Sequence, residues 1–493
     1  MDYVISNHQK IYKLKNYTDI IIIGAGLSGI GSACHLERKN PEKSYIIFEA
    51  RKELGGTWSL FKYPGIRSDS DMYTFGFSFK IWDNPKSFAD APNILKYLNE
   101  AASEHKIHEK IKYQMKVSEV NFDTSKKIWS VITINKSKKR EVFYSRFLFS
   151  CTGYYNYNEG YIPNYQGVDD FRGIFVHPQH WPKNLDYQNK KVVVIGSGAT
   201  AVTLIPEMAK ETSEITMLQR SPSYVGAFPN KDKYAKFLKD CFPKKIAHKL
   251  IRFKNIFVQI LFFNACKIWP SYMKKLLLRA AQKKLGNFPA KPHFEPSYNP
   301  WDQRFCVAPD GDLFKVIREG KAKIITDKIT SFNKKGLKLG SGKSLEADIV
   351  ISATGLKLLA FGGAKISIDN ISYNPSDALT YKGLMLSGLP NCIFFAGYTN
   401  ASWTLKSDLT SEYASRLFNL MDKNKFQYFM PKVLDKNMSI SPLLNLNSGY
   451  INRSSHIFPK QGSKLPWKLY QNYFFDYKML RIDKIQDKNL ILK

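Results

Sequence analysis

The feature that most constrains this chain is a pair of glycine-rich turns, each directly after an apolar, β-branched run. Residues 20–23 read IIII and lead into GAGLSG at 24–29, and residues 191–195 read KVVVI and lead into GSGATA at 196–201. Such runs fill the middle of parallel sheets, and turns with this spacing open the helix of a dinucleotide-binding unit. The chain is therefore predicted to be an α/β protein with two doubly wound, Rossmann-like dinucleotide-binding domains.

The first unit carries every part of a dinucleotide site. Gly24 permits the tight turn, Gly26 lets a pyrophosphate approach the backbone, and Gly29 lets strand and helix pack closely. Residues 27–38 are predicted to form the helix, whose N-terminus offers free N–H groups to phosphates. Glu49 closes the next strand and is expected to accept hydrogen bonds from both ribose hydroxyls.

The second unit ends differently, because its strand at 214–219 runs into Arg220 and Ser221 where the first unit has an acid. An acid would repel the 2′-phosphate of NADP, whereas an arginine pairs with it bidentately. The alternative for Arg220 is a solvated cation at a strand end. We predict FAD in the first site and NADPH in the second. The residues predicted to contact the second cofactor are Gly196, Gly198, Ala199, Thr200, Ala201, Arg220 and Ser221.

At 493 residues the chain is too long for one core. Further strands are expected over 116–132, 143–151, 321–326, 345–353 and 391–396, and a helix over 200–210. The predicted boundaries assign 1–155 and 362–493 to an FAD-binding domain with a C-terminal segment, 156–225 and 300–361 to an NADP-binding domain, and 226–299 to a helical insertion.

The stretch from 231 to 285 is helical in pattern, aromatic and very basic. Its most apolar part, 256–269, is too short to span a bilayer. We favour an insertion that packs on the nucleotide domains and roofs a substrate cleft, because buried helices commonly look like this. The alternative is an interfacial helix, which would make a peripheral contact with the inner face of a membrane through 250–285.

The net charge of +32 has a compositional explanation, since lysine greatly outnumbers arginine. Specific nucleic-acid readers depend on arginine, so no nucleic-acid partner is predicted. A basic membrane-associated or nucleic-acid-binding protein without catalysis is a remote alternative, against which the two complete nucleotide units speak. A colourless purified protein would favour it.

The cysteines are far apart and form no CxxC or CxxxxC pair, which excludes the local dithiol of a disulfide reductase. No metal site is predicted. Residues 1–15 are polar, and the sequence has no run of about 18 apolar residues. We expect a cytoplasmic protein with reduced thiols. Its cysteines are Cys34, Cys151, Cys241, Cys266, Cys306 and Cys392.

A fingerprint stands immediately before the second glycine-rich turn. It consists of Phe171, Gly173, His177, Trp181 and Pro182, in the pattern FxGxxxHxxxWP. With the two turns, this order resembles the type I Baeyer–Villiger monooxygenases over nearly the whole chain. The resemblance implies an FAD domain and an NADP domain with a helical insertion. It also implies that NADPH reduces FAD, that O2 forms a flavin C4a-peroxide, and that ketones become esters or lactones, with sulfoxidation as a second activity.

The resemblance also assigns residues. It makes Asp69 and Arg304 the active-site pair, in which Asp69 orients Arg304 and the guanidinium favours the anionic peroxide. It places Trp403 on the nicotinamide side of the cleft, and His177 is expected to hold the linker between the domains. The further residues it implies at the cofactors are Gly56, Thr57, Trp58, Asp69, Tyr73 and Val117.

One position departs from the family pattern. Many members have lysine just before the active-site arginine, whereas this chain has Gln303. The preference for NADPH over NADH is therefore expected to be weaker than in those members.

The nearest alternative function is an S- or N-oxygenating flavin monooxygenase, which usually lacks the Trp-Pro ending of the fingerprint. The expected partners are O2 and a small-molecule ketone or thioether. The sequence predicts neither the individual substrate nor the oligomeric state.

Overall fold

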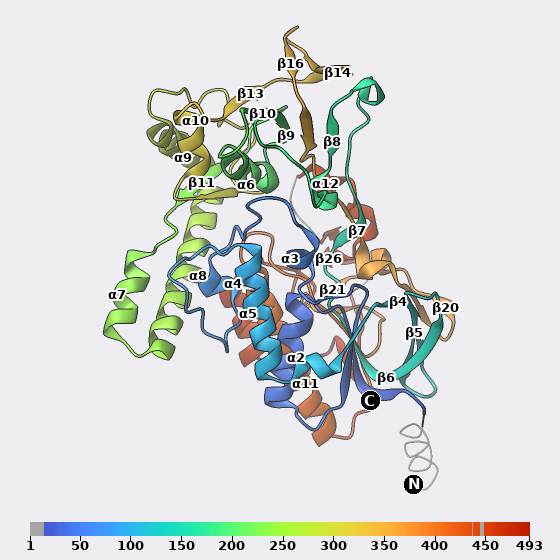
Figure 1. Ribbon diagram of the computed structural model, residues 1–493. Helices are drawn as coiled ribbons and strands as arrows, with labels where there is room; N and C mark the ends of the chain where they lie inside the picture. The colour runs from blue at the N-terminus through green and yellow to red at the C-terminus, as the bar shows by residue number, and fades with distance from the viewer. Residues whose placement is uncertain (1–13, 436, 444–447) are drawn as a thin grey trace.

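Two large sheets organise the molecule, with a five-stranded sheet at the top of Figure 1 and a nine-stranded sheet below it. The structure is a computed structural model that describes residues 14–435, 437–443 and 448–493. Residues 1–13, which are part of the polar stretch 1–15 used to predict that the protein is not secreted, lie outside the described residues.

The larger sheet is built around the strand that precedes the first glycine-rich turn. β1 (Tyr17–Ile23) pairs in parallel with β2 (Tyr45–Glu49) and β6 (Arg140–Ser150). β3 (Ile111–Tyr113) extends this parallel half beside β2, and β23 (Cys392–Phe394) pairs with β6. The parallel half therefore draws on both ends of the chain.

An antiparallel half continues the same sheet. β4 (Met115–Asp123) pairs with β5 (Ile128–Asn135), and β5 pairs with β6. The strand region predicted over 116–132 is thus two strands, divided by a turn in which Lys127 has a positive φ of 58°. β19 (Lys365–Ile368) runs parallel to β4, and β20 (Ile371–Ser372) forms the edge.

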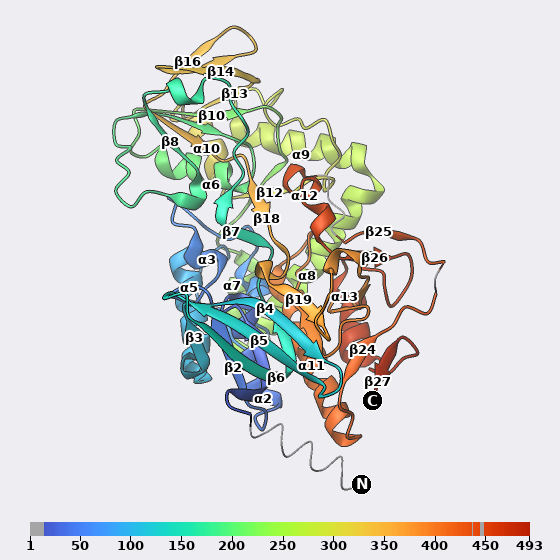
Figure 2. The ribbon, with the colours of Figure 1, turned by 90° about the vertical axis from the view of Figure 1, so that its right-hand side faces the viewer.

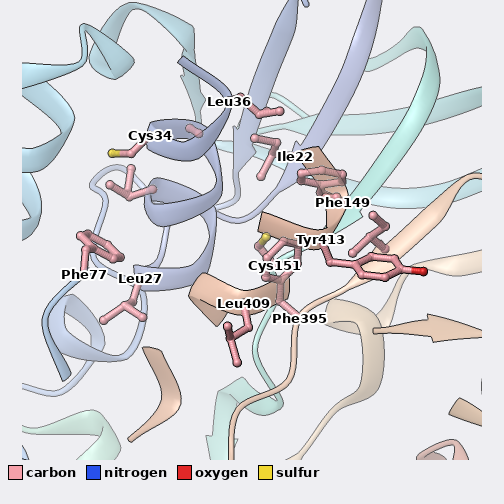
Figure 3. Close-up of a cluster of buried hydrophobic side chains, with 14 of the residues drawn as sticks. Ile22, Leu27, Cys34, Leu36, Phe77, Phe149, Cys151, Phe395, Leu409 and Tyr413 are labelled. Carbon is pink, nitrogen blue, oxygen red and sulfur yellow. The ribbon is translucent and has the colours of Figure 1, made fainter. Parts of the chain in front are cut away.

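Helices cover the parallel half. α2 (Leu27–Lys39) packs against α5 (Ala91–Glu104) and α11 (Trp403–Lys423). Figure 3 shows the core at this junction, with Ile22 of β1 and Leu409 of α11 among the labelled side chains. Both are at most 2% exposed. This packing places the N-terminus of α2 at the end of β1.

The smaller sheet is entirely parallel. Across the sheet its strands are β13 (Lys323–Thr326), β10 (Glu214–Gln219), β9 (Lys191–Ile195), β17 (Ile349–Ser352) and β8 (Ile174–Val176). β9 and β10 have the predicted bounds to the residue. α6 (Ala199–Met208) follows β9 and packs against α10 (Asp312–Arg318). A small antiparallel sheet of β14 (Ile329–Asn333), β15 (Gly336–Leu339) and β16 (Ser344–Glu346) follows β13.

The chain crosses between the sheets along a two-stranded ribbon. β7 (Tyr155–Gly160) leaves the larger sheet after β6, and β18 (Leu356–Leu358) leaves the smaller sheet after β17. The two pair antiparallel, so the outgoing and returning connections support each other.

The helical insertion consists of α7 (Lys233–Cys241), α8 (Lys244–Ile268) and α9 (Pro270–Leu285). It begins later than residue 226, because β11 (Val225–Phe228) pairs with β12 (Cys306–Pro309). Figures 1 and 2 show these helices reaching from the smaller sheet along the side of the larger one. Among the described residues, no helix has the length and apolar character that crossing a bilayer requires.

The C-terminal segment lies against the FAD-side core. α13 (Tyr473–Tyr477) contacts α11. β24 (Phe429–Pro431) pairs with β27 (Leu490–Leu492), and β25 (Ile440–Pro442) pairs with β26 (Lys460–Gly462). This segment completes the fold around α11.

Candidate active site

The first glycine-rich turn opens onto a cavity of about 460 Å³. Gly24 has a φ of +102°, and a Cβ at Gly29 would lie 1.9 Å from the Gly24 carbonyl oxygen, so neither position accepts a side chain. Gly26 caps α2 without a side-chain hydrogen bond. The first N–H groups of the helix therefore remain available to an anion such as a pyrophosphate.

Glu49 stands at the end of β2 beside this turn. Its Oε2 accepts a hydrogen bond from the Ala25 N–H at 2.8 Å, and its Oε1 accepts one from the Arg51 N–H at 2.9 Å. The side chain lines the cavity although the residue is only 6% exposed. Two backbone donors thus hold this carboxylate at the cavity, and its role as acceptor for the ribose hydroxyls stays a prediction.

The paired glycines after β2 press against the first turn. A Cβ at Gly56 would lie 3.1 Å from the Gly26 Cα. Arg51 holds this loop in place, because its Nη1 donates to the Gly56 carbonyl at 3.0 Å and to Ser59 Oγ at 2.8 Å. Arg51 also lines the cavity with Lys116, so both add positive charge near the expected pyrophosphate. The geometry fits an FAD molecule.

The cavity brings together most of the residues predicted on the FAD side. They are Gly24, Gly26, Glu49, Gly56, Thr57, Trp58, Asp69, Val117, Arg304 and Trp403. Trp403 Nε1 donates to Ser28 Oγ at 2.8 Å, which places this ring beside the first turn.

Two predicted cofactor residues lie elsewhere. Gly29 packs behind the turn, against Gly24 and Cys151. Tyr73 sits in α4 (Met72–Phe75), is 2% exposed and does not line the cavity. The Lys239 ammonium lies 5.3 Å from its ring centroid, so its neighbours come from the helical insertion.

Asp69 and Arg304 meet at the cavity although 235 residues separate them. Arg304 Nη2 donates to Asp69 Oδ2 at 3.2 Å, and the two side chains are 36% and 28% exposed. The sequence resemblance pairs these residues, and the structure places them in contact. A guanidinium keeps its proton across the physiological range, so this end of the cavity carries a fixed positive charge.

The loop that carries Asp69 is anchored on both sides. Arg67 Nη2 donates to Asp312 Oδ1 of α10 at 3.2 Å, which ties the loop to the NADP-side domain. Asp71 accepts hydrogen bonds from Asn255 at 2.7 Å and from Gln259 at 3.1 Å, both in α8. The position of Asp69 is therefore set by the FAD-side loop, the second domain and the insertion together.

The loop that carries Arg304 is held by α8. Lys267 Nζ donates to the Trp301 carbonyl at 3.2 Å and to Asp302 Oδ1 at 2.9 Å. The Trp301 and Phe305 rings stack at 5.7 Å on either side of Arg304 in sequence. These contacts limit how far the guanidinium can move from Asp69.

The tyrosines after β6 are functional candidates that were not predicted from the sequence. Tyr154 lines the cavity, its ring lies 5.2 Å from that of Trp403, and burial raises its pKa well above the usual value. Tyr157 also lines the cavity and approaches Gly56. Several tyrosines follow the glycine at the end of this strand in the sequence. This clustering does not show which of their rings face a ligand.

The second glycine-rich turn is open to solvent. Gly198 caps α6 without a side-chain hydrogen bond, and a Cβ there would meet nothing within 4 Å. Arg220 and Ser221 are exposed directly after β10, and Ser197 Oγ donates to the Ser221 carbonyl at 2.9 Å. A dinucleotide phosphate at the start of α6 and a 2′-phosphate at Arg220 fit this arrangement.

The remaining residues of this turn differ in what they face. Thr200 lies beside the Tyr63 hydroxyl of the FAD-side loop. Ala201 is fully buried in the domain core, and Gly196 packs on the Ala353 carbonyl. Of the predicted contacts in this turn, Gly198 and Ala199 are exposed, as are Arg220 and Ser221 at the end of β10.

His177 of the fingerprint secures the interdomain ribbon. Its Nδ1 accepts a hydrogen bond from the Gln179 N–H at 3.2 Å, and its Nε2 donates to the Gly355 carbonyl at 3.1 Å. Burial lowers its pKa, so the ring is neutral at physiological pH. A Cβ at Gly160 of β7 would lie 1.9 Å from the ring. His177 thus joins β8 to β7 and to the start of β18, as expected for a linker residue.

A family profile and individual relatives both match this chain as a flavin-binding monooxygenase-like sequence. The profile described as "Flavin-binding monooxygenase-like" matches residues 17–357. The FAD-containing monooxygenase EthA of Mycolicibacterium smegmatis is 47% identical, with 97% of each chain covered. The probable FAD-binding monooxygenase AlmA of Acinetobacter baylyi is 45% identical, with 96% of each chain covered.

Solved structures share the fold at lower identity. An oxidised steroid monooxygenase bound to NADP superposes with a TM-score of 0.73 at 18% identity, with 97% of this chain and 99% of that chain covered. OTEMO in complex with FAD and NADP gives a TM-score of 0.69 at 22% identity, covering 84% and 88%. The chain therefore belongs to the flavin-binding monooxygenase-like family, and it shares its fold with these solved monooxygenases.

Proposed function

We propose that this enzyme converts small-molecule ketones into esters or lactones and oxidises thioethers as a second activity. The contact between Arg304 and Asp69 at the cavity supports this proposal most directly. The flavin, when bound and reduced by NADPH, supplies the activation of O2 and the transfer of one oxygen atom. The protein's contribution is charge, orientation and exclusion of water.

Arg304 provides the charge. Its guanidinium stabilises an oxyanion that forms next to it, because it is already positive and needs no reorganisation when the negative charge develops. Asp69 orients the guanidinium through a charge-assisted hydrogen bond. The Trp58, Tyr154 and Trp403 rings line the same cavity and limit its water content.

Product analysis tests this function. Purified enzyme with NADPH and O2 is offered a cyclic ketone and a thioether of similar size, and NADPH consumption and products are measured together. We expect lactone from the ketone, with sulfoxide as a second product. Sulfoxide alone, with no oxygenation of any ketone in a panel, would favour the S- or N-oxygenating alternative.

Arg220 is proposed to select NADPH over NADH. We expect Arg220→Ala to raise KM for NADPH about 10- to 100-fold, because a hydrogen bond to a charged group contributes roughly 1.5–3 kcal/mol. KM for NADH should stay within about twofold, since NADH has no 2′-phosphate for Arg220 to bind. Initial rates with each coenzyme measure this. Lys210→Ala is the matched control, as Lys210 is an exposed cation just beyond the far end of α6. An equal loss with both coenzymes would contradict the assignment.

The proposed location is the cytoplasm, with a peripheral contact at the inner face of the membrane through the insertion. None of the six cysteines is in a disulfide. Cys151 lies on the cavity, but burial raises the pKa of its thiol, which leaves it a poor redox group. This supports a reducing compartment and speaks against a dithiol mechanism.

A further inference from the structure

Helix α8 exposes a stripe of apolar side chains to solvent. Ile246, Leu250, Phe253, Phe257, Leu261 and Ile268 are between 40% and 64% exposed. Their spacing of three, four or seven residues places them in one stripe along the helix. We call this stripe the insertion face. A surface helix of a globular protein normally directs such a stripe at the core.

The opposite side of α8 faces the protein and carries several polar side chains. Arg252 is 7% exposed, and its Nη1 donates to the Tyr73 carbonyl at 2.8 Å and to the Gly76 carbonyl at 2.7 Å. Asn255 and Gln259 bond Asp71, as described above. His248 is 4% exposed, and burial lowers its pKa to about 4. The packing of α8 therefore uses these polar side chains together with the buried Ala247, Ile251, Ile256 and Cys266, and it leaves the apolar side chains of the insertion face outward.

Aromatic residues extend the insertion face beyond the stripe on α8. Trp269 and Tyr272, at the corner between α8 and α9, are 60% and 65% exposed. Phe253 lies 5.8 Å from Phe474 of α13, which is itself 36% exposed. Apolar areas of this extent are uncommon on monomeric proteins and mark interaction sites.

Basic residues outnumber acids along the insertion helices, although Lys244, Lys254 and Lys267 pair with acids from outside them. Residues 233–285 contain 14 lysines and arginines and one acid, Asp240. Asp240 is paired with Lys236 at 2.6 Å. Lys245, Lys249 and Lys275 are exposed beside the apolar stripe. The surface is thus apolar in its centre and cationic at its rim.

We propose that the insertion face binds the surface of an anionic lipid bilayer, with α8 lying in the membrane plane. Aromatic and aliphatic side chains would enter the interface between headgroups and acyl chains, and the lysines would meet the anionic headgroups. A second copy of the chain fits less well, because a symmetric contact would bring the same positive rims together.

This orientation places the membrane next to the active site, a consequence that rests on the proposed function. Phe262 and Phe263 of α8 lie 5.4 Å from Phe305 and 5.6 Å from Trp301, the two rings that flank Arg304 in sequence. A ketone dissolved in the bilayer would therefore leave it beside the loop that holds the catalytic guanidinium.

Vesicle flotation of the full-length holoenzyme tests the proposal. The probes are vesicles of phosphatidylcholine alone and of phosphatidylcholine with a quarter phosphatidylglycerol. We expect the enzyme to float with the anionic vesicles, at least tenfold less with the neutral ones, and less as salt is raised. A Phe253→Ser/Phe257→Ser double variant should lose at least tenfold in bound fraction, and Lys245→Glu/Lys249→Glu should lose binding to the anionic vesicles.

Ile371→Ser is the matched control, since Ile371 is 74% exposed on β20, in the sheet opposite the insertion helices, and it should bind as the unmodified enzyme does. All variants should keep their flavin content and their turnover of a water-soluble ketone, which separates a failure of membrane binding from a failure of the proposed function. Equal binding to neutral and anionic vesicles, or no binding at all, would overturn the proposal. The proposal would also be overturned if sedimentation showed that the unmodified enzyme is a dimer and that only the Phe253→Ser/Phe257→Ser variant is a monomer.

Discussion

Replacing Arg304 by alanine is expected to lower lactone formation about 10²- to 10³-fold, the loss typical of removing one preorganised donor from a developing oxyanion. NADPH oxidation should persist, because Arg304 lies at the FAD-side cavity, whereas the second glycine-rich turn and Arg220 belong to the other domain. Oxygen consumption should then appear as hydrogen peroxide. Parallel assays of NADPH, hydrogen peroxide and lactone measure the uncoupling.

Two further variants refine this result. Arg304→Lys keeps the charge but not the planar fork that reaches Asp69 at 3.2 Å, so its lactone yield should fall between those of the alanine variant and the unmodified enzyme. Arg140→Ala is the control, since Arg140 is an exposed arginine of β6 that pairs with Glu119, and it should leave coupling unchanged. Normal lactone formation by the alanine variant would remove Arg304 from the mechanism.

The parts of the site that the sequence predicts are those with local signals. Both glycine-rich turns, the strands of the second unit and Glu49 follow from spacing within about 30 residues. The structure gives Glu49 two backbone donors and leaves the first turn of α2 free for an anion. These features depend on backbone geometry that short motifs encode.

Contacts that depend on the path of a loop could not be predicted from the sequence. Arg51 folds back onto Gly56 and Ser59 only because of the path taken by their loop. Tyr73 follows the active-site loop closely in sequence, yet α4 directs its ring toward the insertion. The pairing of Arg304 with Asp69 was accessible through family resemblance alone.

The insertion shows a different limit of prediction from the sequence. Its pattern favoured a helix whose apolar side packs on the nucleotide domains, which is the usual outcome. The helix does pack there, through the buried Ile251 and Ile256 and through hydrogen bonds of Arg252, Asn255 and Gln259. A second apolar stripe nevertheless stays exposed. Periodicity identifies the apolar positions of a helix. It does not show which of them the neighbouring domains will cover.

The carboxylate that holds this polar side of α8 is Asp408 of α11, which is 5% exposed. It accepts hydrogen bonds from His35 Nε2 of α2 at 3.2 Å, from Arg252 Nη2 at 3.2 Å and from the Ser78 N–H at 2.8 Å. These partners lower its pKa against the effect of burial. A lowered pKa means that the ionised carboxylate stabilises the fold above the usual aspartate range, and that this contribution is lost as pH falls below it.

Asp408→Ala should therefore reduce the free energy of unfolding by about 3–5 kcal/mol, because it leaves Arg252 as a buried charge without its counter-ion. Asp422→Ala on the same helix should cost less than about 1 kcal/mol, since that carboxylate is 41% exposed in its pair with Lys43. Urea unfolding of the holoenzyme at neutral pH measures both. Adding Arg252→Met to Asp408→Ala should recover part of the loss, because the double variant buries no unpaired charge. If Asp408→Ala and Asp422→Ala were equally mild, the buried carboxylate would not be what fastens the insertion to the FAD-side core.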